Sequence, residues 1–293
     1  MRISGQRGYW YLLSPFVFAC GGARSSQPVV PPPMPTIPAS QPMPPATPTS
    51  ALWSFTYMPG TTTYRISRSA AIESNGSDSL QHREISTNIV HELLTLESAD
   101  QGMNFTAVID TFATTTQGLL GPVQPVQLPV QVSGSLGDSA ITINNETANQ
   151  KCSAISSMLV TDLHNLLVPF PKQLSSEVRW KDSTDVQGCQ AGILTSAHTT
   201  RSFVVSGESS YEGHPVLLIL RADTTRAQGE GGLQQHRVSI DVTGTGAAVY
   251  YLDATAGRII HMTVDQILNL SLTTLTGRFQ FKQDSKQDFR VVP

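Results

Sequence analysis

The sequence has few charged residues and few aromatic residues, and its charge is close to balanced. Charged residues make up 14% of the 293 residues and aromatic residues 7%, and the net charge is −3 at pH 7. An average globular chain has about 25% charged residues. A chain with so little excess charge lacks the basic field that binds a nucleic-acid backbone. We therefore expect no nucleic-acid partner.

The sequence also lacks the local motifs of common reactions and metal sites. It contains no Gly-x-Ser-x-Gly elbow, Ser-x-x-Lys pair, P-loop or EF-hand spacing. His91-Glu92-Leu93-Leu94 begins like a zinc-protease helix, but Thr95 stands where the second His would be. In Gly244-Thr245-Gly246 the third Gly of a dinucleotide fingerprint is replaced by Val249. We predict a non-catalytic protein without a metal or cofactor, and the alternative is a hydrolase whose residues meet only in space.

No apolar run in the sequence is long enough to span a membrane as a helix. The run at residues 9–19 is shorter than the about 18 to 20 residues that a membrane-spanning helix needs. Arg2 and Arg7 precede it, and Ala19 is a small residue at its end. This is the composition of a secretory signal peptide, so we expect residues 1–19 to be removed from the mature protein.

Cys20 lies at the predicted cleavage point. Val17-Phe18-Ala19-Cys20 resembles the lipobox of bacterial lipoproteins, in which the Cys is lipidated and becomes the mature N-terminus. The resemblance implies that Cys20 carries acyl groups such as palmitate, and more than one acyl chain holds a protein stably on a membrane. It implies a cell-envelope protein anchored in the outer membrane and facing the periplasm. The alternative is a secreted protein in which Cys20 lies near the cleavage site by chance.

Two further cysteines complete the set. If Cys20 carries lipid, Cys152 and Cys189 remain as an even pair in an oxidising compartment, which favours a disulfide. Closing a loop of that length should stabilise the fold by about 4 kcal/mol in the chain-entropy model. The alternative is two unrelated buried thiols. We expect no metal site, because no Cys-x-x-Cys or paired His spacing accompanies these cysteines.

The mature chain is predicted to begin with a tether. Residues 20–50 are rich in proline and have almost no charge, so they cannot build a core. Such a segment favours the extended polyproline II conformation, which rises about 3.1 Å per residue. We interpret it as a disordered spacer between the lipid anchor and a domain at residues 51–293.

Residues 51–145 and 176–292 are predicted to be strands. Apolar and polar residues alternate there, as at Tyr64 and Ile66, and turn signals at Asn75-Gly76 and Asp100-Gln101-Gly102 separate three long strands of a meander. The proline-containing segment 118–137 is expected to be an edge strand or a loop. Later strands are predicted over residues 177–182, 193–200, 201–207, 215–221, 236–242, 247–252 and 258–264.

One helix is predicted between the two sets of strands, over residues 147–167. Its apolar residues follow helical spacing, and prolines follow the end of the pattern. The stripe consists of Ile155, Met158, Leu159, Leu163 and Leu166. These side chains are candidates for lining a ligand cavity between the helix and a sheet. The alternative is that they form the ordinary core, because an amphipathic helix must bury its apolar face in any case.

Two phrases among the later strands suggest a family of folds. Ser210-Tyr211-Glu212-Gly213-His214-Pro215-Val216 and Tyr250-Tyr251-Leu252-Asp253-Ala254-Thr255-Ala256-Gly257-Arg258 are turn-strand phrases. They resemble envelope proteins with the curved half-barrel of lipoprotein carriers, over residues 61–292. The resemblance implies a mainly β (α+β) fold in which an antiparallel sheet wraps a helix. It also implies a hydrophobic ligand or lipid as partner. The alternative is a structural or adaptor protein that contacts another envelope component.

Overall fold

The computed structural model describes residues 52–74, 83–117, 127–144, 153–176, 178–190, 193–232 and 237–293. The predicted signal peptide, the lipidation site Cys20, the tether, the Asn75-Gly76 turn and Cys152 lie outside these ranges. Within them, no helix has the length and hydropathy needed to cross a membrane.

Strands dominate the described chain. In chain order the elements are β1 (Trp53–Ser54), β2 (Gly60–Ser74), β3 (Arg83–Ala99), β4 (Gly102–Gln117), β5 (Val130–Leu136), β6 (Ile141–Asn144), α1 (Ala154–Leu166), β7 (Gln173–Leu174), β8 (Arg179–Gln190), β9 (Ile193–Tyr211), β10 (His214–Gly231), β11 (Val238–Asp253), β12 (Arg258–Thr274) and β13 (Gly277–Val292). The predicted mainly β class with a helix on a sheet is confirmed.

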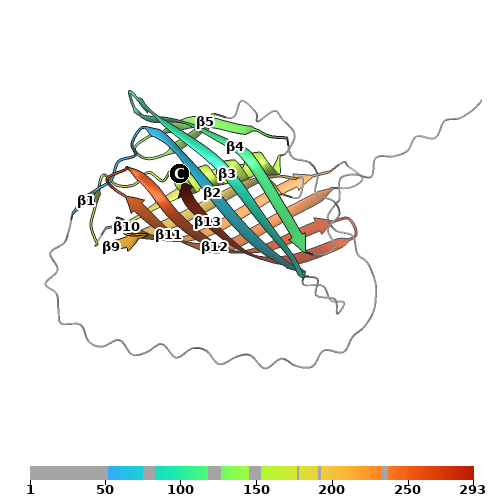
Figure 1. Cartoon of the computed structure of the whole chain (residues 1–293). Coiled ribbons are helices and arrows are strands. Elements are labelled where there is room, and N and C mark those ends of the chain that lie inside the picture. Colours follow the sequence, from blue (N-terminus) through green and yellow to red (C-terminus); the bar gives the residue numbers. More distant parts are fainter. Residues whose placement is uncertain are drawn as a thin grey trace, which may run out of the picture.

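Eleven of the strands form one antiparallel sheet that curls into a half-barrel. The strand order is β6-β5-β4-β3-β2-β13-β12-β11-β10-β9-β8, so two meanders join where β13 pairs with β2. The chain leaves the sheet at the edge strand β6, forms α1, and returns at the opposite edge strand β8. Figure 1 shows α1 on the inner side of the curl. The helix lies against β8 and also against β5 and β4, so it bridges the two edges of the sheet.

The helix begins at Ala154, seven residues after the predicted start, and ends at nearly the predicted residue. Ser153 caps its N-terminus, because the Ser153 hydroxyl accepts a hydrogen bond from the backbone N–H of Ser156 at 3.3 Å. The last helical residue is Leu166, one residue earlier than expected. Val168 precedes a proline, and a residue in that position disfavours helical backbone angles. Residues 147–152 of the predicted helix lie outside the described ranges.

The later strands are longer than predicted. The segments 193–200 and 201–207 belong to one strand, β9, and β11 continues through Gly244-Thr245-Gly246. The sequence pattern predicts strand boundaries after Thr200 and around Gly244-Thr245-Gly246. The strands continue because the inner face carries paired polar side chains in this region, as with the Thr199 and Thr225 hydroxyls at 3.0 Å. The turn signals at residues 100–102 and 253–257 are confirmed, with Gly102 and Gly257 at positive φ.

The interpretation of segment 118–137 as an edge strand or loop is wrong for its last part. β5 pairs with β4 on one side and β6 on the other, so it is not an edge. The reason is the position of the prolines: Pro129 directly precedes the strand and none lies within it. Every backbone N–H of β5 is therefore available to the ladder.

The core lies between α1 and the inner face of the sheet. Leu159 and Leu163 are fully buried, Leu166 is 1% exposed and Ile155 is 9% exposed. They belong to one cluster with inward side chains of the sheet such as Tyr250. Burying such a leucine side chain contributes about 1.5 to 3 kcal/mol.

Cys189 also lies beside the helix. Its backbone N–H donates a 2.7 Å hydrogen bond to the Ser157 hydroxyl of α1, and Cys189 forms a disulfide bond. Cys152 is one residue before the N-cap Ser153 in the sequence. The disulfide between Cys152 and Cys189 stays a prediction, because Cys152 is outside the described ranges.

Truncating Leu163 should test how much the helix contributes to stability. We expect Leu163→Ala to lower the free energy of unfolding by about 2 to 5 kcal/mol, because a fully buried leucine leaves a cavity. Leu275→Ala, at a residue that is 72% exposed, should change it by less than about 0.5 kcal/mol. Urea unfolding of the two variants makes the comparison, and equal losses would contradict the packing described here.

Candidate functional site

The inner face of the sheet changes character along each strand. On β10 every second residue points inward, as in any strand. From the core outward these residues are Ile219, Arg221, Asp223, Thr225 and Ala227. The face is thus apolar in the core, charged beyond it, and then apolar again.

The charged level forms a belt under and beside α1. We use the name polar belt for the inward charged residues of the sheet: Arg68, Glu92, Asp182, Arg201, Arg221 and Asp223. They come from β2 and β3 on one side of the sheet and from β8, β9 and β10 on the other, so the belt has two groups separated by β13, β12 and β11.

Three arginines of the belt hold the helix. Arg68 pairs with Asp162 of α1. Arg201 donates to the backbone oxygen of His164, and Arg221 donates to the Asn165 Oδ1 at 2.8 Å. Hydrogen bonds with a charged donor are about twice as strong as neutral ones. These contacts fix the position of α1 over the sheet.

Two of these arginines also have carboxylate partners on the sheet. Arg201 makes a two-pronged contact with Asp182, through Nε–Oδ1 at 2.7 Å and Nη2–Oδ2 at 2.6 Å. Arg221 contacts Asp223 Oδ2 at 2.9 Å. With the pair of Arg68 and Asp162, the three guanidinium groups are balanced by three aspartates.

Glu92 is the carboxyl group left over. It is fully buried, and its carboxyl group shares a hydrogen bond with the carboxyl group of Asp162. Burial raises the pKa of Glu92 well above its ordinary value of 4.5, and the nearby charge of Asp162 raises it further. Burial raises the pKa of Asp162 too, and Arg68 opposes that shift. Glu92 is therefore the protonated, neutral member of the pair.

Several buried polar atoms near the belt have no protein partner among the described residues. They include Trp180 Nε1, Arg221 Nε, Asp223 Oδ1 and Gln287 Oε1. Burial lowers the pKa of His164 to about 4, so its ring is neutral at pH 7. Buried polar groups in folded proteins are usually partnered, by water where protein groups are lacking. We therefore expect ordered water beside these atoms.

Beyond the belt the inner face is apolar again. We call this surface the far floor; its residues are Ile193, Ala227, Val238, Ile240, Val242, Leu268, Leu270 and Leu272. They form a cluster separate from the core under α1. The three leucines are only half-buried, although β12 is an interior strand of the sheet.

The placement of α1 explains why the far floor is separate. The helix packs along β8, β5 and β4, and Ser157 near its N-terminus lies beside Gly188 and Cys189 of β8. These two residues pair with Thr195 and Leu194, so along β8 the helix reaches the level of the far floor. The half-buried leucines of the far floor lie on β12, which is separated from β8 by β9, β10 and β11.

Two glycines shape the boundary between the belt and the far floor. A Cβ at Gly246 would lie 2.3 Å from Asp223 Oδ1, and a Cβ at Gly244 would lie 2.4 Å from the Leu268 Cδ2 atom. Only glycine lets these two side chains lie flat over β11. Asp223 and Leu268 are thereby placed on neighbouring parts of one surface.

The structure places the predicted cavity-lining residues in the core. Ile155, Leu159, Leu163 and Leu166 are buried, and Met158 is half-buried against the same cluster. They lie together on one side of α1, as their spacing predicted. None of them belongs to the far floor, which the sequence analysis did not identify as a site.

The belt was missed as well, although the sequence holds a signal for it. Arg201, Arg221 and Asp223 stand at inward positions of strands in a chain with few charges. Such residues are almost never buried unless they are paired. Among the described residues, no three His, Cys, Asp or Glu side chains gather as a metal site would require.

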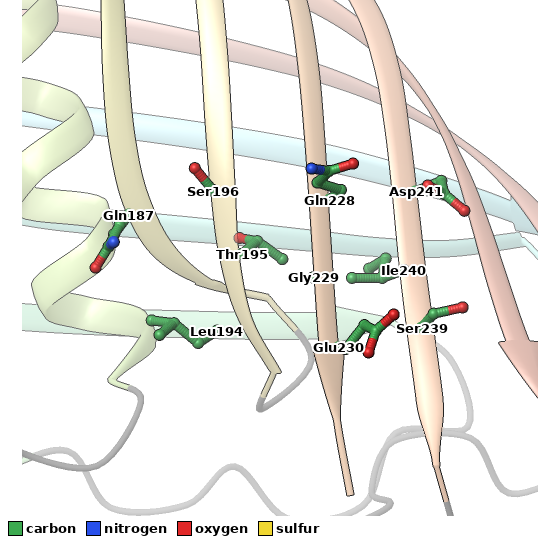
Figure 2. A pocket seen from close by; sticks show the side chains of 10 residues that line it. All are labelled: Gln187, Leu194, Thr195, Ser196, Gln228, Gly229, Glu230, Ser239, Ile240 and Asp241. Carbon is green, nitrogen blue, oxygen red and sulfur yellow. The ribbon is translucent and has the colours of Figure 1, made fainter.

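A shallow hollow of about 510 Å³ lies on β8, β9, β10 and β11 near the far end of the strands. Figure 2 shows its side chains, most of which are polar; they include Gln187, Ser196, Gln228 and Asp241. These four alternate along their strands with inward residues, so they belong to the outer face. Leu194 in this hollow is 57% exposed.

Comparison with known proteins gives a distant structural likeness. No model of a known family matches the sequence, and no curated protein matches it. A crystal structure of a DUF1329 family protein from Desulfovibrio piger ATCC 29098 is similar at 10% sequence identity, over 79% of this chain and 86% of that chain, with a TM-score of 0.15. A score this low supports no argument about family or function.

Replacing Glu92 should change how stability depends on pH. Between pH 4.5 and the raised pKa of Glu92, the unfolded chain gives up this proton and the folded chain keeps it. The free energy of unfolding should therefore fall as pH rises, by up to about 1.4 kcal/mol per pH unit. We expect Glu92→Gln to remove this contribution, measured by urea unfolding from pH 5 upward.

The control is Glu97→Gln, because Glu97 is an exposed residue of the same strand. This variant should retain the pH dependence of the unchanged protein. Parallel pH profiles for Glu92→Gln and the unchanged protein would contradict a buried, neutral Glu92.

Proposed function

We propose that this chain is a non-catalytic cell-envelope lipoprotein whose half-barrel binds a hydrophobic ligand, such as a lipid, on the far floor. The observation that carries the proposal is the half-burial of an apolar surface on the inner face of the sheet. Leu268, Leu270 and Leu272 lie on an interior strand, and α1 packs along β8, β5 and β4 instead of over them.

The energetics favour an apolar occupant. Each Å² of apolar surface removed from water contributes about 25 cal/mol. The three leucines stand two residues apart and span about 14 Å at a rise of about 3.4 Å per residue. Val242 and Ile240 on β11 pair across from Leu270 and Leu272 and widen this apolar strip. A strip of this shape suits an extended hydrocarbon chain.

The lipoprotein part of the proposal rests on the N-terminal sequence. Val17-Phe18-Ala19-Cys20 supports lipidation of Cys20 and attachment to the outer membrane, with the domain in the periplasm. The proline-rich residues 20–50 would hold the half-barrel away from the membrane surface. In that position the domain reaches molecules of the envelope.

A second candidate function is an adaptor that contacts another envelope component. The hollow on the outer face supports it, because Leu194 there is exposed beside polar side chains. Monomeric proteins expose single apolar residues commonly, however, and a docking surface needs a larger patch. The far floor, with its three half-buried leucines on one strand, favours ligand binding.

Probe binding tests the proposal. An apolar fluorescent probe such as N-phenyl-1-naphthylamine should bind the full chain carrying Cys20→Ser, which needs no detergent. Leu270→Asn should weaken binding about tenfold or more, because a polar amide would enter the apolar strip. The matched control is Ile267→Asn, since Ile267 points outward on the same strand and is 44% exposed. Equal affinities of the two variants would contradict the proposed site.

Anchoring gives an independent test. The mature protein isolated from its source membrane should begin at Cys20 and carry the added mass of acyl groups. Cys20→Ser should release the protein into the soluble fraction. Mass spectrometry of the N-terminal peptide decides the matter, and an unmodified Cys20 in the mature protein would refute the anchor.

A further inference from the structure

The surface between the polar belt and the far floor carries hydrogen-bonding groups in reach of an occupant. Thr199 and Thr225 face each other across β9 and β10, with their hydroxyls 3.0 Å apart and both side chains half-buried. Asp223 precedes Thr225 on the same inner face, and its Oδ1 has no partner among the described residues. These groups can donate and accept hydrogen bonds at one place.

The charges around this place cancel. Arg201 is paired with Asp182, and Arg221 with Asp223. An anionic group entering here would approach two aspartates, and a cationic group would approach two arginines. Bringing an unpaired charge into a buried site costs several kcal/mol. An uncharged group with hydroxyls avoids that cost and still satisfies the free donor and acceptor positions.

The order of polar and apolar residues along the strands sets the orientation of a bound molecule. Along β10 the sequence of inward residues is Asp223, Thr225, Ala227, and along β12 the half-buried leucines lie level with Thr225 and beyond. The polar groups are on the side of the core, and the far floor is toward the far end of the strands. An amphiphile that matches this order enters with its polar head first.

Building on the proposed function, we infer that the ligand is an amphiphile with an uncharged, hydroxyl-bearing head group. The head binds at Thr199, Thr225 and Asp223, and the hydrocarbon tail lies along Leu270 and Leu272. The site thus selects the head group by hydrogen bonding and accepts the tail by its apolar surface.

Competition between three probes that share one tail tests the inference. Monooleoylglycerol has a hydroxyl head, oleate is anionic and oleylamine is cationic at pH 7. Each displaces the fluorescent probe from the full chain carrying Cys20→Ser, below its aggregation concentration. We expect monooleoylglycerol to bind about tenfold more tightly than either charged probe, because only its head avoids an unpaired buried charge.

Paired threonine variants locate the head group. Thr199→Val with Thr225→Val should weaken monooleoylglycerol binding about five- to tenfold, through the loss of hydrogen bonds. The fluorescent probe, which has no hydroxyl head group, should lose less affinity than monooleoylglycerol in the same double variant. The control is Thr200→Val with Thr224→Val, because those threonines form the neighbouring pair on the exposed outer face. Urea unfolding of both double variants checks that each remains folded.

The outcomes separate this inference from the function it rests on. Equal binding of the three probes, with loss of all three in Leu270→Asn, would overturn the head-group inference and leave a general hydrophobic site. Tighter binding of oleate or oleylamine would overturn it as well, and so would a threonine double variant indistinguishable from its control. Failure of every probe, including the fluorescent one, would refute the proposed function itself.

Discussion

The structure depends on the contacts by which arginines of the sheet hold α1. Arg68, Arg201 and Arg221 reach the helix from three strands and fix it at one level of the half-barrel. Replacing a buried ion pair by apolar residues is often neutral or stabilising, so such pairs are weak evidence for stability alone. In this protein the arginine contacts fix the position of α1 on the sheet. A helix held along β8, β5 and β4 closes the core, and the leucines of β12 form a cluster apart from it.

This arrangement separates two apolar regions that would otherwise merge. The core under α1 contains the helix leucines, and the far floor contains the leucines of β12. A polar belt between them prevents a single continuous core, because charged side chains there must keep their partners. The fold is stabilised by the first region, and the second is available for binding. Both apolar regions exist because the long strands carry polar inward-facing residues between them.

Much of the fold could be predicted from the sequence, and the candidate site could not. Alternation and turn signals gave the β class, and helical spacing gave α1 with its buried leucines. The far floor was missed because Leu268, Leu270 and Leu272 follow the alternation of any strand. Only the structure shows that α1 packs along β8, β5 and β4 instead of on them. The belt was missed because Arg201 and Asp182 are far apart in polar segments and become a pair only through the register of β8 and β9.

The most direct test of this account is the mass of the full chain from its source membrane, measured under native and then denaturing conditions. Covalent acyl groups at Cys20 remain in both measurements, whereas a molecule on the far floor is lost on denaturation. We predict a near-stoichiometric difference in mass that corresponds to an apolar or amphiphilic compound. Identical masses, from a protein shown to be folded, would contradict a half-barrel that carries a ligand.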